Sequence, residues 1–376
     1  MISDVVVIGA GVLGASTAWH LLGLGAGRVV LVDPTPAGGS TARATGGFRS
    51  TYASALNVRL SLLSRAKLLR FQDETGVDPG YRQVGYLWLA RSAADRARLA
   101  SALEVQRDAG VTDSRLVDID EARRLNPAVT DAEIVGGAFG ASDGTIRPLA
   151  ILSGYLEGAR RAGAEVVAER AVGLIGGERV LGVKTEARTI AAGTVVLAAG
   201  AWSGAFARAA GVGVPVVPLR RQVAETEPCP LPDDMPMTLW LDDGFHIRER
   251  DGRALLLRPT PGAEDPFDTT VDPAWLAAIQ ATAGQRIRGL AGLPIARSWG
   301  GLYEMSPDGH ALLGAVPGRS GLYAVGGASG HGVMHSPALG QLLAETIVVG
   351  SARALDARPL ALERFAEGRA HAPDPL

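Results

Sequence analysis

The sequence has one cysteine, Cys229, and two lysines, Lys67 and Lys184, among its 376 residues. A single cysteine cannot form an intrachain disulfide or a cysteine-based zinc site, so a disulfide scaffold is excluded and no metal is expected. The composition is compatible with a reducing compartment, and we expect a cytoplasmic protein. The scarcity of lysine also removes most candidates for a catalytic lysine or a Schiff base.

A strong charge of either sign is also absent. The formal net charge is −2, so no chain-wide basic field exists for nucleic acid or an anionic membrane surface. The apolar stretch from Val5 to about Ala26 has the length of a membrane span or a signal peptide. However, Gly9, Gly11 and Gly14 interrupt it, and Asp4 stands where a signal peptide would be positive. We therefore expect neither nucleic acid nor a membrane as a partner.

The length and the hydrophobic content predict two domains. Hydrophobic residues make up 47% of the chain and charged residues 20%, which is enough to bury a large core. The 49 glycines and 22 prolines have no fixed period and indicate many tight turns. Changes in sequence character predict an α/β protein with a discontinuous first domain and a second domain inserted into it. The first comprises residues 1–80, 145–215 and 305–376, and the second comprises residues 81–144 and 216–304.

A strand, a glycine turn and a helix are predicted at the start of the chain. The β-branched run Val5–Ile8 precedes Gly9, Gly11 and Gly14, which match a dinucleotide fingerprint. In this motif the first glycine permits the turn, the second lets a pyrophosphate approach, and the third allows close helix–strand packing. A second strand ends at Asp33, where a carboxylate would bind ribose hydroxyls and oppose a 2′-phosphate. The expected contacts are Gly9, Gly11, Val12, Leu13, Gly14, Asp33 and Pro34.

Two further glycine turns stand far along the chain. The apolar strand Thr194–Ala198 breaks on small residues, so a cofactor longer than NAD could pass close to the backbone. The strand Gly321–Gly326 is followed by a glycine loop and a helix, whose N-terminus could stabilise negative charge on a reduced isoalloxazine ring. None of the six tyrosines has a lysine four residues on, as a short-chain NAD enzyme would require. These features favour FAD, with expected contacts at Ala199, Gly200, Trp202, Gly327, Ser329, Gly330, His331, Gly332, Val333 and Met334.

Four segments together resemble the D-amino-acid-oxidase superfamily of FAD-dependent flavoproteins, and most closely the branch of monomeric sarcosine oxidase and the sarcosine oxidase beta subunit. The segments are residues 5–14, 39–49, 195–203 and 327–333. The likeness extends from Val5 to about Ile347. It implies a Rossmann-like FAD-binding domain and a substrate domain with a mixed or antiparallel sheet.

The resemblance also implies further cofactor contacts. In such proteins the loop after the second strand runs under the pyrophosphate and the flavin, which here would use Ser40, Thr41, Arg43, Thr45, Gly46 and Gly47. The backbone of Val172 matches the position that meets adenine. Gly301 stands where monomeric sarcosine oxidase has the cysteine that links FAD covalently, so we expect noncovalent FAD.

Arg49 is the predicted substrate-binding residue. It matches the arginine that holds the substrate carboxylate in sarcosine oxidases, and a guanidinium suits bidentate recognition of a carboxylate. The alternative for Arg49 is a structural salt bridge. Tyr303, His246, Arg248 and Arg258 are expected to line the same pocket, with a solvated hairpin side chain or a packed tyrosine as the alternative for each.

Two other positions depart from the family pattern. Leu256 aligns approximately with the lysine credited with oxygen activation, which favours a dehydrogenase with another acceptor as much as an oxidase. Met334 replaces a second carboxylate-binding lysine.

His331 is expected to face the flavin rather than to act as a base. Ser329 and His331 do not form a hydrolase pair, because no nucleophile elbow frames the serine.

The expected function is oxidation of the C–N bond of a small amino acid or secondary amine, such as sarcosine, another N-methyl amino acid, proline or glycine, by hydride transfer to flavin N5. The electron acceptor would be oxygen or another compound. Two alternatives stay open at this point. One is a flavin-bearing subunit of a hetero-oligomeric amino-acid dehydrogenase, which would need a partner subunit. The other is a non-catalytic FAD-binding assembly protein.

Overall fold

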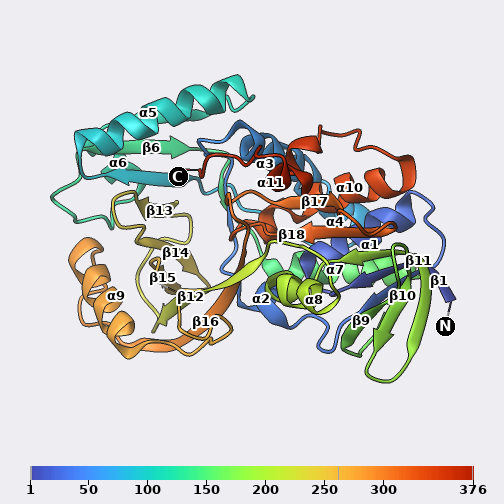
Figure 1. Cartoon of the computed structure of the whole chain (residues 1–376). Helices are drawn as coiled ribbons and strands as arrows, with labels where there is room; N and C mark the ends of the chain where they lie inside the picture. Colours follow the sequence, from blue (N-terminus) through green and yellow to red (C-terminus); the bar gives the residue numbers. More distant parts are fainter. Residues whose placement is uncertain (1, 261, 375) are drawn as a thin grey trace.

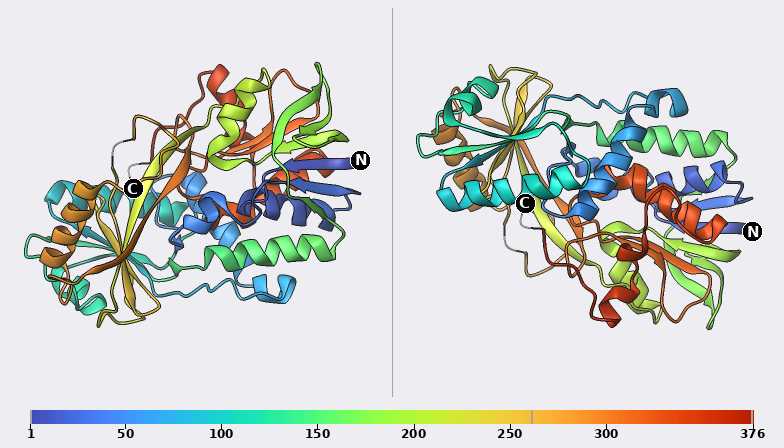
Figure 2. Two further views of the ribbon diagram at one scale, coloured as in Figure 1. Left: turned by 90° about the horizontal axis from the view of Figure 1, so that it is seen from below. Right: turned by 90° about the horizontal axis from the view of Figure 1, so that it is seen from above.

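The computed structural model describes residues 2–260, 262–374 and 376. Two eight-stranded sheets lie side by side, and helices pack on each of them (Figure 1). The first strand of the chain lies at the outer end of one half, whereas the last residues lie near the junction between the halves (Figure 2). A small two-stranded sheet, β3 (Gly47–Phe48) with β7 (Gly144–Thr145), is formed by segments that lead from one half to the other.

The first sheet consists of β1 (Ile2–Ile8), β2 (Val29–Val32), β8 (Glu165–Val167), β9 (Ala171–Gly176), β10 (Val180–Thr185), β11 (Thr189–Leu197), β17 (Leu312–Ala315) and β18 (Leu322–Gly326). Its order is β17-β18-β11-β1-β2-β8, and β10 and β9 continue from β11. The central pairs are parallel. Val5–Ile8 are buried on both sides, which explains why the strand is a continuous β-branched run rather than an alternating one.

The second sheet consists of β4 (Tyr86–Ala90), β5 (Ser114–Val117), β6 (Gly136–Gly140), β12 (Val217–Thr226), β13 (Met237–Trp240), β14 (His246–Arg250), β15 (Arg253–Leu257) and β16 (Ile295–Met305). Its order is β16-β12-β15-β14-β13-β4-β6-β5, and all pairs are antiparallel except β13 with β4. Ile247 and Leu256 pack on one face with Trp275 and Ile279 of α9 (Pro273–Arg286). Because side chains alternate along a strand, their neighbours face the first half of the molecule.

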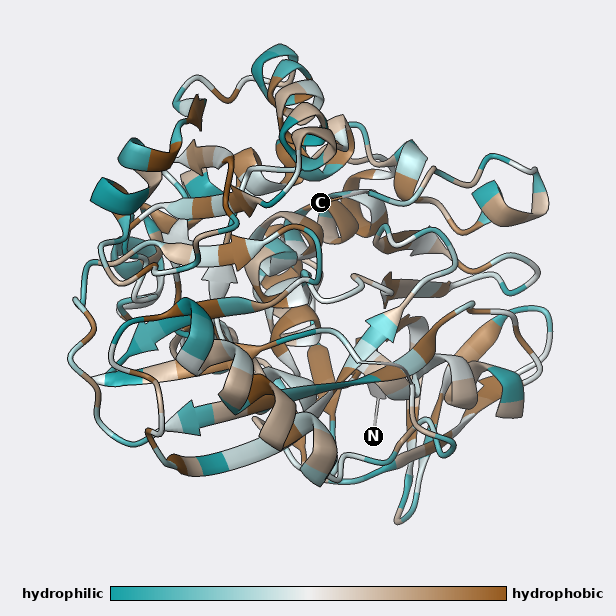
Figure 3. Cartoon of the chain, turned by 90° about the vertical axis from the view of Figure 1, so that its left-hand side faces the viewer, coloured by the Kyte–Doolittle hydropathy of each residue, from teal (hydrophilic) through white to brown (hydrophobic). Residues whose placement is uncertain are grey.

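The remaining helices are α1 (Val12–Gly23), α2 (Gly39–Arg43), α3 (Ala55–Leu68), α4 (Phe71–Thr75), α5 (Ala93–Asp108), α6 (Ile119–Leu125), α7 (Pro148–Arg161), α8 (Ser203–Ala209), α10 (Gly332–Val349) and α11 (Glu363–Ala366). Apolar residues of α1, α3, α7 and α10 form one core with β1 and β2. Hydrophilic residues gather on the outer helices, and apolar ones on inward faces (Figure 3). No described helix combines the length and the apolar character needed to span a membrane.

The predicted α/β fold with a mixed sheet in its second half is confirmed. The predicted Asp-Gly hairpin is present, with Asp251 at φ 53° and Gly252 at φ 78° between β14 and β15. The periodicity of residues 56–75 predicts a helix that ends at Gly76, and this stretch is helical as α3 and α4, with a break between them. The chain leaves the helix at Arg70 (φ −111°, ψ 2°), which turns Phe71 into the core. The exact domain boundaries stay a prediction.

Candidate active site

The glycine turn after β1 has the geometry of a phosphate cradle. A Cβ atom at Gly14 would lie 2.0 Å from the carbonyl oxygen of Gly9, so α1 can pack on the turn only with glycine there. Gly9 has φ 103°, which favours glycine. A Cβ at Gly11 would approach only Thr41 Oγ1, at 3.5 Å, so open space lies over the N-terminus of α1. The N-cap residue, Gly11, has no side chain to cap that terminus, and Thr41 Oγ1 accepts from Val12 N–H. The other N–H groups of the first turn fit a pyrophosphate.

Asp33 lies at the end of β2 beside this turn. Its Oδ2 accepts a hydrogen bond from the backbone N–H of Ala10 at 2.7 Å, and its Oδ1 accepts one from Thr35 N–H at 2.8 Å. The carboxylate thus bridges the glycine turn and the loop after β2. Pro34 next to it is exposed. The position suits a ribose contact, because a carboxylate has further lone pairs for hydroxyl groups.

The loop after β2 is tied to both halves of the molecule. Thr41 Oγ1 accepts from Val12 N–H at 3.2 Å, so this side chain touches the phosphate cradle. Arg43 Nη1 donates to the carbonyl oxygen of Gly300 at 2.7 Å, and Trp299 Nε1 donates to the Arg43 carbonyl oxygen at 2.9 Å. A Cβ at Gly301 would lie 3.3 Å from Arg43 Cβ. The loop therefore runs beside the position where relatives carry the linking cysteine. Ser40 is half-buried on α2.

Arg248 holds the next part of this loop. Its Nη1 donates to the carbonyl oxygens of Thr45 at 2.5 Å and Gly46 at 2.6 Å. Gly46 has φ 79°, and a Cβ there would lie 2.2 Å from the Ile146 carbonyl oxygen. Arg248 was expected to line the substrate pocket. The structure gives its Nη1 atom two backbone carbonyls of the cofactor loop instead, because the loop crosses the end of β14.

The turn after β11 touches the first glycine turn. A Cβ at Gly9 would lie 2.3 Å from the carbonyl oxygen of Ala198, so the two turns pack backbone to backbone. Gly200 has φ 55° and starts the short 3-10 helix η1 (Gly200–Trp202). Trp202 is 44% exposed and stacks on Phe267 with ring centroids 6.0 Å apart. Ala199 is half-buried beside them.

The third glycine turn joins β18 to α10. Ser329 N–H donates to the Glu304 carbonyl oxygen at 3.0 Å, and Ser329 Oγ accepts from Ser306 N–H at 3.2 Å, so this side chain braces the turn. A Cβ at Gly330 would lie 2.3 Å from the ring of Tyr303. Helix α10 begins at Gly332, and the side chains of Val333 and Met334 pack into the hydrophobic core.

The Glu304 side chain lies close to two of the glycine turns. A Cβ at Gly200 would lie 3.7 Å from Glu304 Oε2, and one at Gly332 would lie 3.3 Å from Glu304 Oε1. Gly200 follows β11 and Gly332 opens α10, so two turns that are distant in sequence converge on one carboxyl group. Together with the contact between Gly9 and Ala198, this gives a continuous strip of small residues and helix N-termini that fits an extended dinucleotide.

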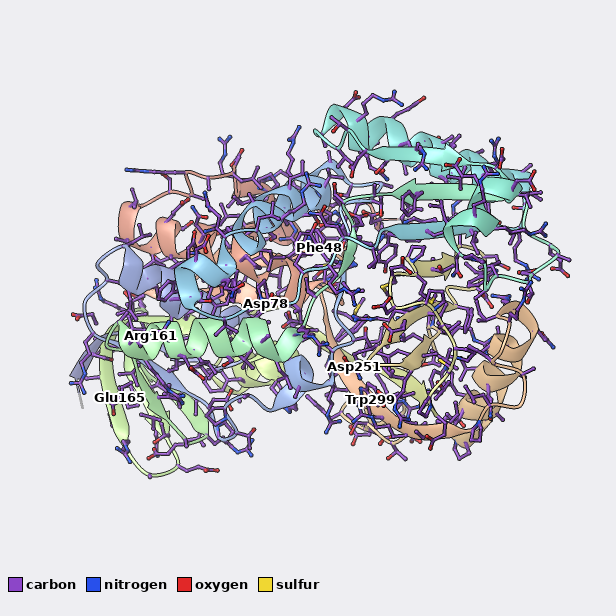
Figure 4. All side chains as sticks on the ribbon, turned by 180° about the vertical axis from the view of Figure 1, so that it is seen from behind. Phe48, Asp78, Arg161, Glu165, Asp251 and Trp299 are labelled. Atoms are coloured by element: carbon purple, nitrogen blue, oxygen red, sulfur yellow. The ribbon has the colours of Figure 1, made fainter. Side chains whose placement is uncertain are left out.

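Arg49 lies in a cage of aromatic side chains. It is 8% exposed, and its Cζ lies 4.0 Å from the ring centroid of Tyr52 and 4.9 Å from that of Trp88. Nη1 donates to the Thr51 carbonyl oxygen at 3.1 Å. Phe48, one residue before, lies at the junction of the two halves (Figure 4). Among the described residues no Asp or Glu side chain forms an ion pair with Arg49, which argues against a salt bridge with such a side chain.

Two further groups complete the surroundings of the Arg49 guanidinium. Nη2 donates to the carbonyl oxygen of Leu376 at 3.0 Å and lies 3.4 Å from His331 Nε2. Burial lowers the pKa of His331 well below its usual value, and the Arg49 charge lowers it further. His331 is therefore neutral at physiological pH. An acid group that reaches Nη2 must replace the Leu376 oxygen.

A buried carboxylate fixes the backbone next to Arg49. Asp143 Oδ1 accepts from the N–H and the hydroxyl of Ser50 at 2.6 and 2.7 Å, and Oδ2 accepts from the Thr51 hydroxyl at 2.8 Å. Burial raises the pKa of Asp143 to about 6, although these hydrogen bonds oppose the shift. The sequence analysis missed this residue, because no local motif marks it.

Tyr303 and His246 lie close enough to Arg49 for its charge to influence both. Burial raises the pKa of Tyr303. Burial lowers the pKa of His246 to about 4, and the charges of Arg49 and Arg221 lower it further. The Arg221 guanidinium lies 5.4 Å from the Tyr303 ring centroid and donates to the Thr260 carbonyl oxygen at 2.9 Å. The sequence analysis also missed Arg221, which supplies a second cation where Met334 replaces the family lysine.

Three predicted residues do not join this group. Arg258 lies near Thr282 and Asp243, at 3.4 and 3.9 Å, on the α9 side of the sheet. Leu256 is buried in the core on the same side, so a lysine there would not reach the site. Its neighbours Leu255 and Leu257 occupy the face with His246, and the site face of β15 is therefore apolar. Val172 is 46% exposed on β9, and its backbone contact with adenine stays a prediction.

The chain matches known proteins over nearly its whole length. Residues 4–346 match the family model DAO, FAD dependent oxidoreductase. Glycine oxidase of Pseudomonas putida is 30% identical over 375 residues, covering 96% of this chain and 99% of that protein. FAD-dependent oxidoreductase domain-containing protein 1 of Xenopus laevis is 28% identical over 96% of this chain and 82% of its own.

A solved structure shares the whole fold. L-proline dehydrogenase from P. horikoshii superposes with a TM-score of 0.91 at 25% identity, covering 98% of this chain and 99% of that chain. Members of the matching family use FAD, which agrees with the cradle formed by the glycine turns. The chain therefore belongs to the DAO family of FAD-dependent oxidoreductases and is an enzyme with FAD as its cofactor.

Proposed function

We propose that this enzyme oxidises the C–N bond of a small amino acid or secondary amine that carries a carboxylate. The observation that carries the proposal is the buried guanidinium of Arg49, which pairs with no Asp or Glu side chain among the described residues and lies beside Tyr303, His246 and the third glycine turn. A buried cation without a counter-ion is costly, so an anionic ligand would stabilise it. The relatives support this substrate class, since they include a glycine oxidase and an L-proline dehydrogenase.

In this proposal bound FAD supplies the hydride acceptor, and the protein supplies position and charge. Arg49 would hold the substrate carboxylate and so direct the reacting carbon toward the ring. The nearby guanidinium groups of Arg49 and Arg221 would lower the pKa of the substrate amine, because both disfavour a further positive charge. The neutral amine is the form that can release a hydride. Positioning and electrostatics would then provide most of the rate, with no side chain needed as a general base.

We propose that the apolar face of β15 that lies toward the site determines which electron acceptor the enzyme uses. Leu255 and Leu257 offer no cation on this face, unlike the lysine that the resemblance to sarcosine oxidases implies approximately at Leu256. This favours a dehydrogenase that passes electrons to another acceptor, while oxygen stays the alternative. Noncovalent FAD is part of the same proposal, because Gly301 cannot form the thioether.

The experiment is an anaerobic absorbance titration of the yellow holoprotein with sarcosine, other N-methyl amino acids, proline, glycine and D-amino acids. At least one should bleach the flavin, and readmission of air then shows whether oxygen reoxidises it quickly. Amines that lack the carboxylate serve as controls and should bleach it poorly. If every amino acid fails while dithionite still reduces the flavin, the proposed substrate class is wrong.

A matched variant tests the role of Arg49. Arg49→Met keeps an unbranched side chain, although a shorter one, and removes the charge, and we expect it to bind FAD normally. The substrate concentration for half-maximal bleaching should rise roughly 10- to 100-fold, the usual effect of losing a charged hydrogen bond. Arg49→Lys should recover only part of the lost substrate affinity, because an ammonium group lacks the planar fork of a guanidinium. A wild-type response of both variants would remove Arg49 from the substrate site.

A further inference from the structure

Glu304 has a carboxyl oxygen without a partner in the interior of the protein. Its Oε2 is shielded from solvent and makes no hydrogen bond with any described residue. Its Oε1 receives one long hydrogen bond, 3.4 Å from Ala328 N–H. Buried polar atoms in folded proteins nearly always have a partner, and leaving one unsatisfied is destabilising. The partner of Oε2 is therefore a group other than the described side chains, and a bound molecule is one source of it.

The surroundings of Oε2 indicate which molecule this is. Cβ atoms at Gly326 and Gly200 would lie 3.3 and 3.7 Å from Oε2. Gly332, whose Cβ would lie 3.3 Å from Oε1, starts α10. These glycines belong to the turns after β11 and β18, the turns nearest to the flavin half of the cofactor in the sequence-based interpretation. The space above a glycine is where a ligand can approach the backbone closely.

No charged side chain balances this carboxyl group. The other titratable side chains on its own strand and on the elements packed against that strand are Arg297, Tyr303, Arg220, Arg221, Glu225 and Arg43. None of these forms a hydrogen bond or an ion pair with Glu304 among the described residues. Burial raises the pKa of Glu304 to about 7, and the Ala328 N–H is the one group that opposes this shift. The carboxyl group can thus be protonated under physiological conditions.

We propose that Glu304 holds a proton at Oε2 and donates it to an acceptor oxygen of the flavin half of FAD. The proposal concerns the cofactor and does not depend on the identity of the substrate. A neutral Glu304 leaves the positive N-terminal end of the α10 dipole free to stabilise negative charge on the ring, whereas an ionised Glu304 opposes it. Glu304 would therefore help to set the reduction potential of the flavin.

The first test is a pH titration of the holoprotein absorbance spectrum between pH 5.5 and 9 without substrate. The wild type should show one transition near neutral pH, because ionisation of Glu304 changes the charge beside the ring. Glu304→Gln keeps the shape and a donor but cannot ionise, so the transition should disappear. Glu345→Gln is the control, since Glu345 is buried near the far end of α10 and has hydrogen bonds from Arg353 and Ala354 N–H. A transition that persists in Glu304→Gln would overturn the proposal.

The second test measures FAD binding and the midpoint potential. Glu304→Leu removes the donor, and FAD should bind to its apoprotein roughly tenfold more weakly or worse, while Glu304→Gln should bind FAD like the wild type. The potential of the wild type should fall more steeply with pH above about 7 than that of Glu304→Gln, since reduction then draws a proton to Glu304. Equal slopes, or undiminished FAD affinity in Glu304→Leu, would contradict the proposal. If Glu304→Leu does not fold, the measurements on Glu304→Gln still decide whether the proposal holds.

Discussion

At the residue scale, the proposed site depends on buried cations that pair with no Asp or Glu side chain of the described residues. Arg49 stacks on Tyr52 and lies in a largely apolar environment, and Arg221 lies over the ring of Tyr303. Burial lowers the pKa of Arg221. The two guanidinium groups lie close enough to His246 to lower its pKa together. Such an arrangement suits a substrate that brings its own negative charge.

The second cation leads to a prediction about pH dependence. In Arg221→Met the pKa of the bound substrate amine should rise, because one neighbouring positive charge is lost. The rate of anaerobic flavin reduction should then increase with pH at higher values than in the wild type. The measurement is rapid-mixing flavin reduction at a saturating amino acid concentration across pH 6 to 10. An unshifted profile would mean that Arg221 does not act on the amine.

The residues that sequence reasoning found and missed differ in one physical respect. Gly9 and Asp33 belong to one local unit, so their spacing alone predicts the dinucleotide turn. Arg221, Asp143 and Glu304 become relevant only through contacts with segments far along the chain. No local pattern reports such contacts. They could have been found only by asking which strand positions face the first half of the molecule.

At the element scale, two glycines of the turn after β1 have different roles, one in folding and the other in ligand binding. Gly14→Ala should destabilise the protein strongly, because its Cβ would lie 2.0 Å from the Gly9 carbonyl oxygen. Gly11→Ala should leave the thermal unfolding of the apoprotein near the wild-type value, since its Cβ meets only Thr41 Oγ1 at 3.5 Å. FAD affinity of Gly11→Ala should nevertheless fall at least about tenfold, because the methyl group occupies the space for the pyrophosphate. Calorimetry and FAD titration check both variants, and tight FAD binding by Gly11→Ala would place the pyrophosphate elsewhere.

The segment His371–Leu376 is the second element with a testable role. Its Leu376 carbonyl oxygen bonds Arg49, and Asp374 accepts from the N–H groups of Ala53 and Ser54 at 3.1 and 3.0 Å. A chain cut after Ala370 should bind amino acids more tightly, with a lower KM, because a competitor for Arg49 is removed. Its unfolding temperature should fall, since the hydrogen bonds to Asp374 are lost. An unchanged KM would show that this segment does not compete with the substrate.

The periodicity of the sequence predicted most helices and strands, but it did not predict which of their side chains face the site. The run Val5–Ile8 and the Asp251-Gly252 turn gave the correct strand and hairpin. On β15, however, the resemblance matches Leu256 approximately with the lysine credited with oxygen activation, whereas the structure turns Leu256 into the core. A shift of one residue along a strand moves a side chain to the opposite face. The break at Arg70 likewise follows from tertiary packing of Phe71 rather than from helix propensity.

At the scale of the whole molecule, the active site lies where the second sheet meets the cofactor-binding turns of the first half. Arg248 of β14 and Trp299 of β16 bond the backbone of the cofactor loop, so the sheet that carries the substrate residues also holds that loop. This coupling was not predictable from sequence, because it depends on how the two halves meet. It explains how Tyr303 and Arg49, which are distant in sequence, come near each other.

Stability should also depend on pH through buried histidines. Burial lowers the pKa of both His20 and His335 to about 3, so they stay neutral in the folded chain while they protonate near pH 6.5 when unfolded. Stability should therefore fall as the pH drops below about 6.5, by up to about 1.4 kcal/mol per pH unit for each group. Thermal unfolding between pH 7 and 4.5 checks this. His335→Gln should show a shallower decline, and an identical decline would assign it to other groups.

The central chemical claim is that a hydride leaves the carbon next to the amine nitrogen while Arg49 holds the carboxylate. Anaerobic rapid-mixing flavin reduction tests it directly, with the most effective amino acid compared with the same compound deuterated on that carbon. We expect slower reduction with the deuterated compound in the wild type, and little reduction of either kind in Arg49→Met. Equal rates for the two compounds, together with normal reduction of Arg49→Met, would contradict the claim.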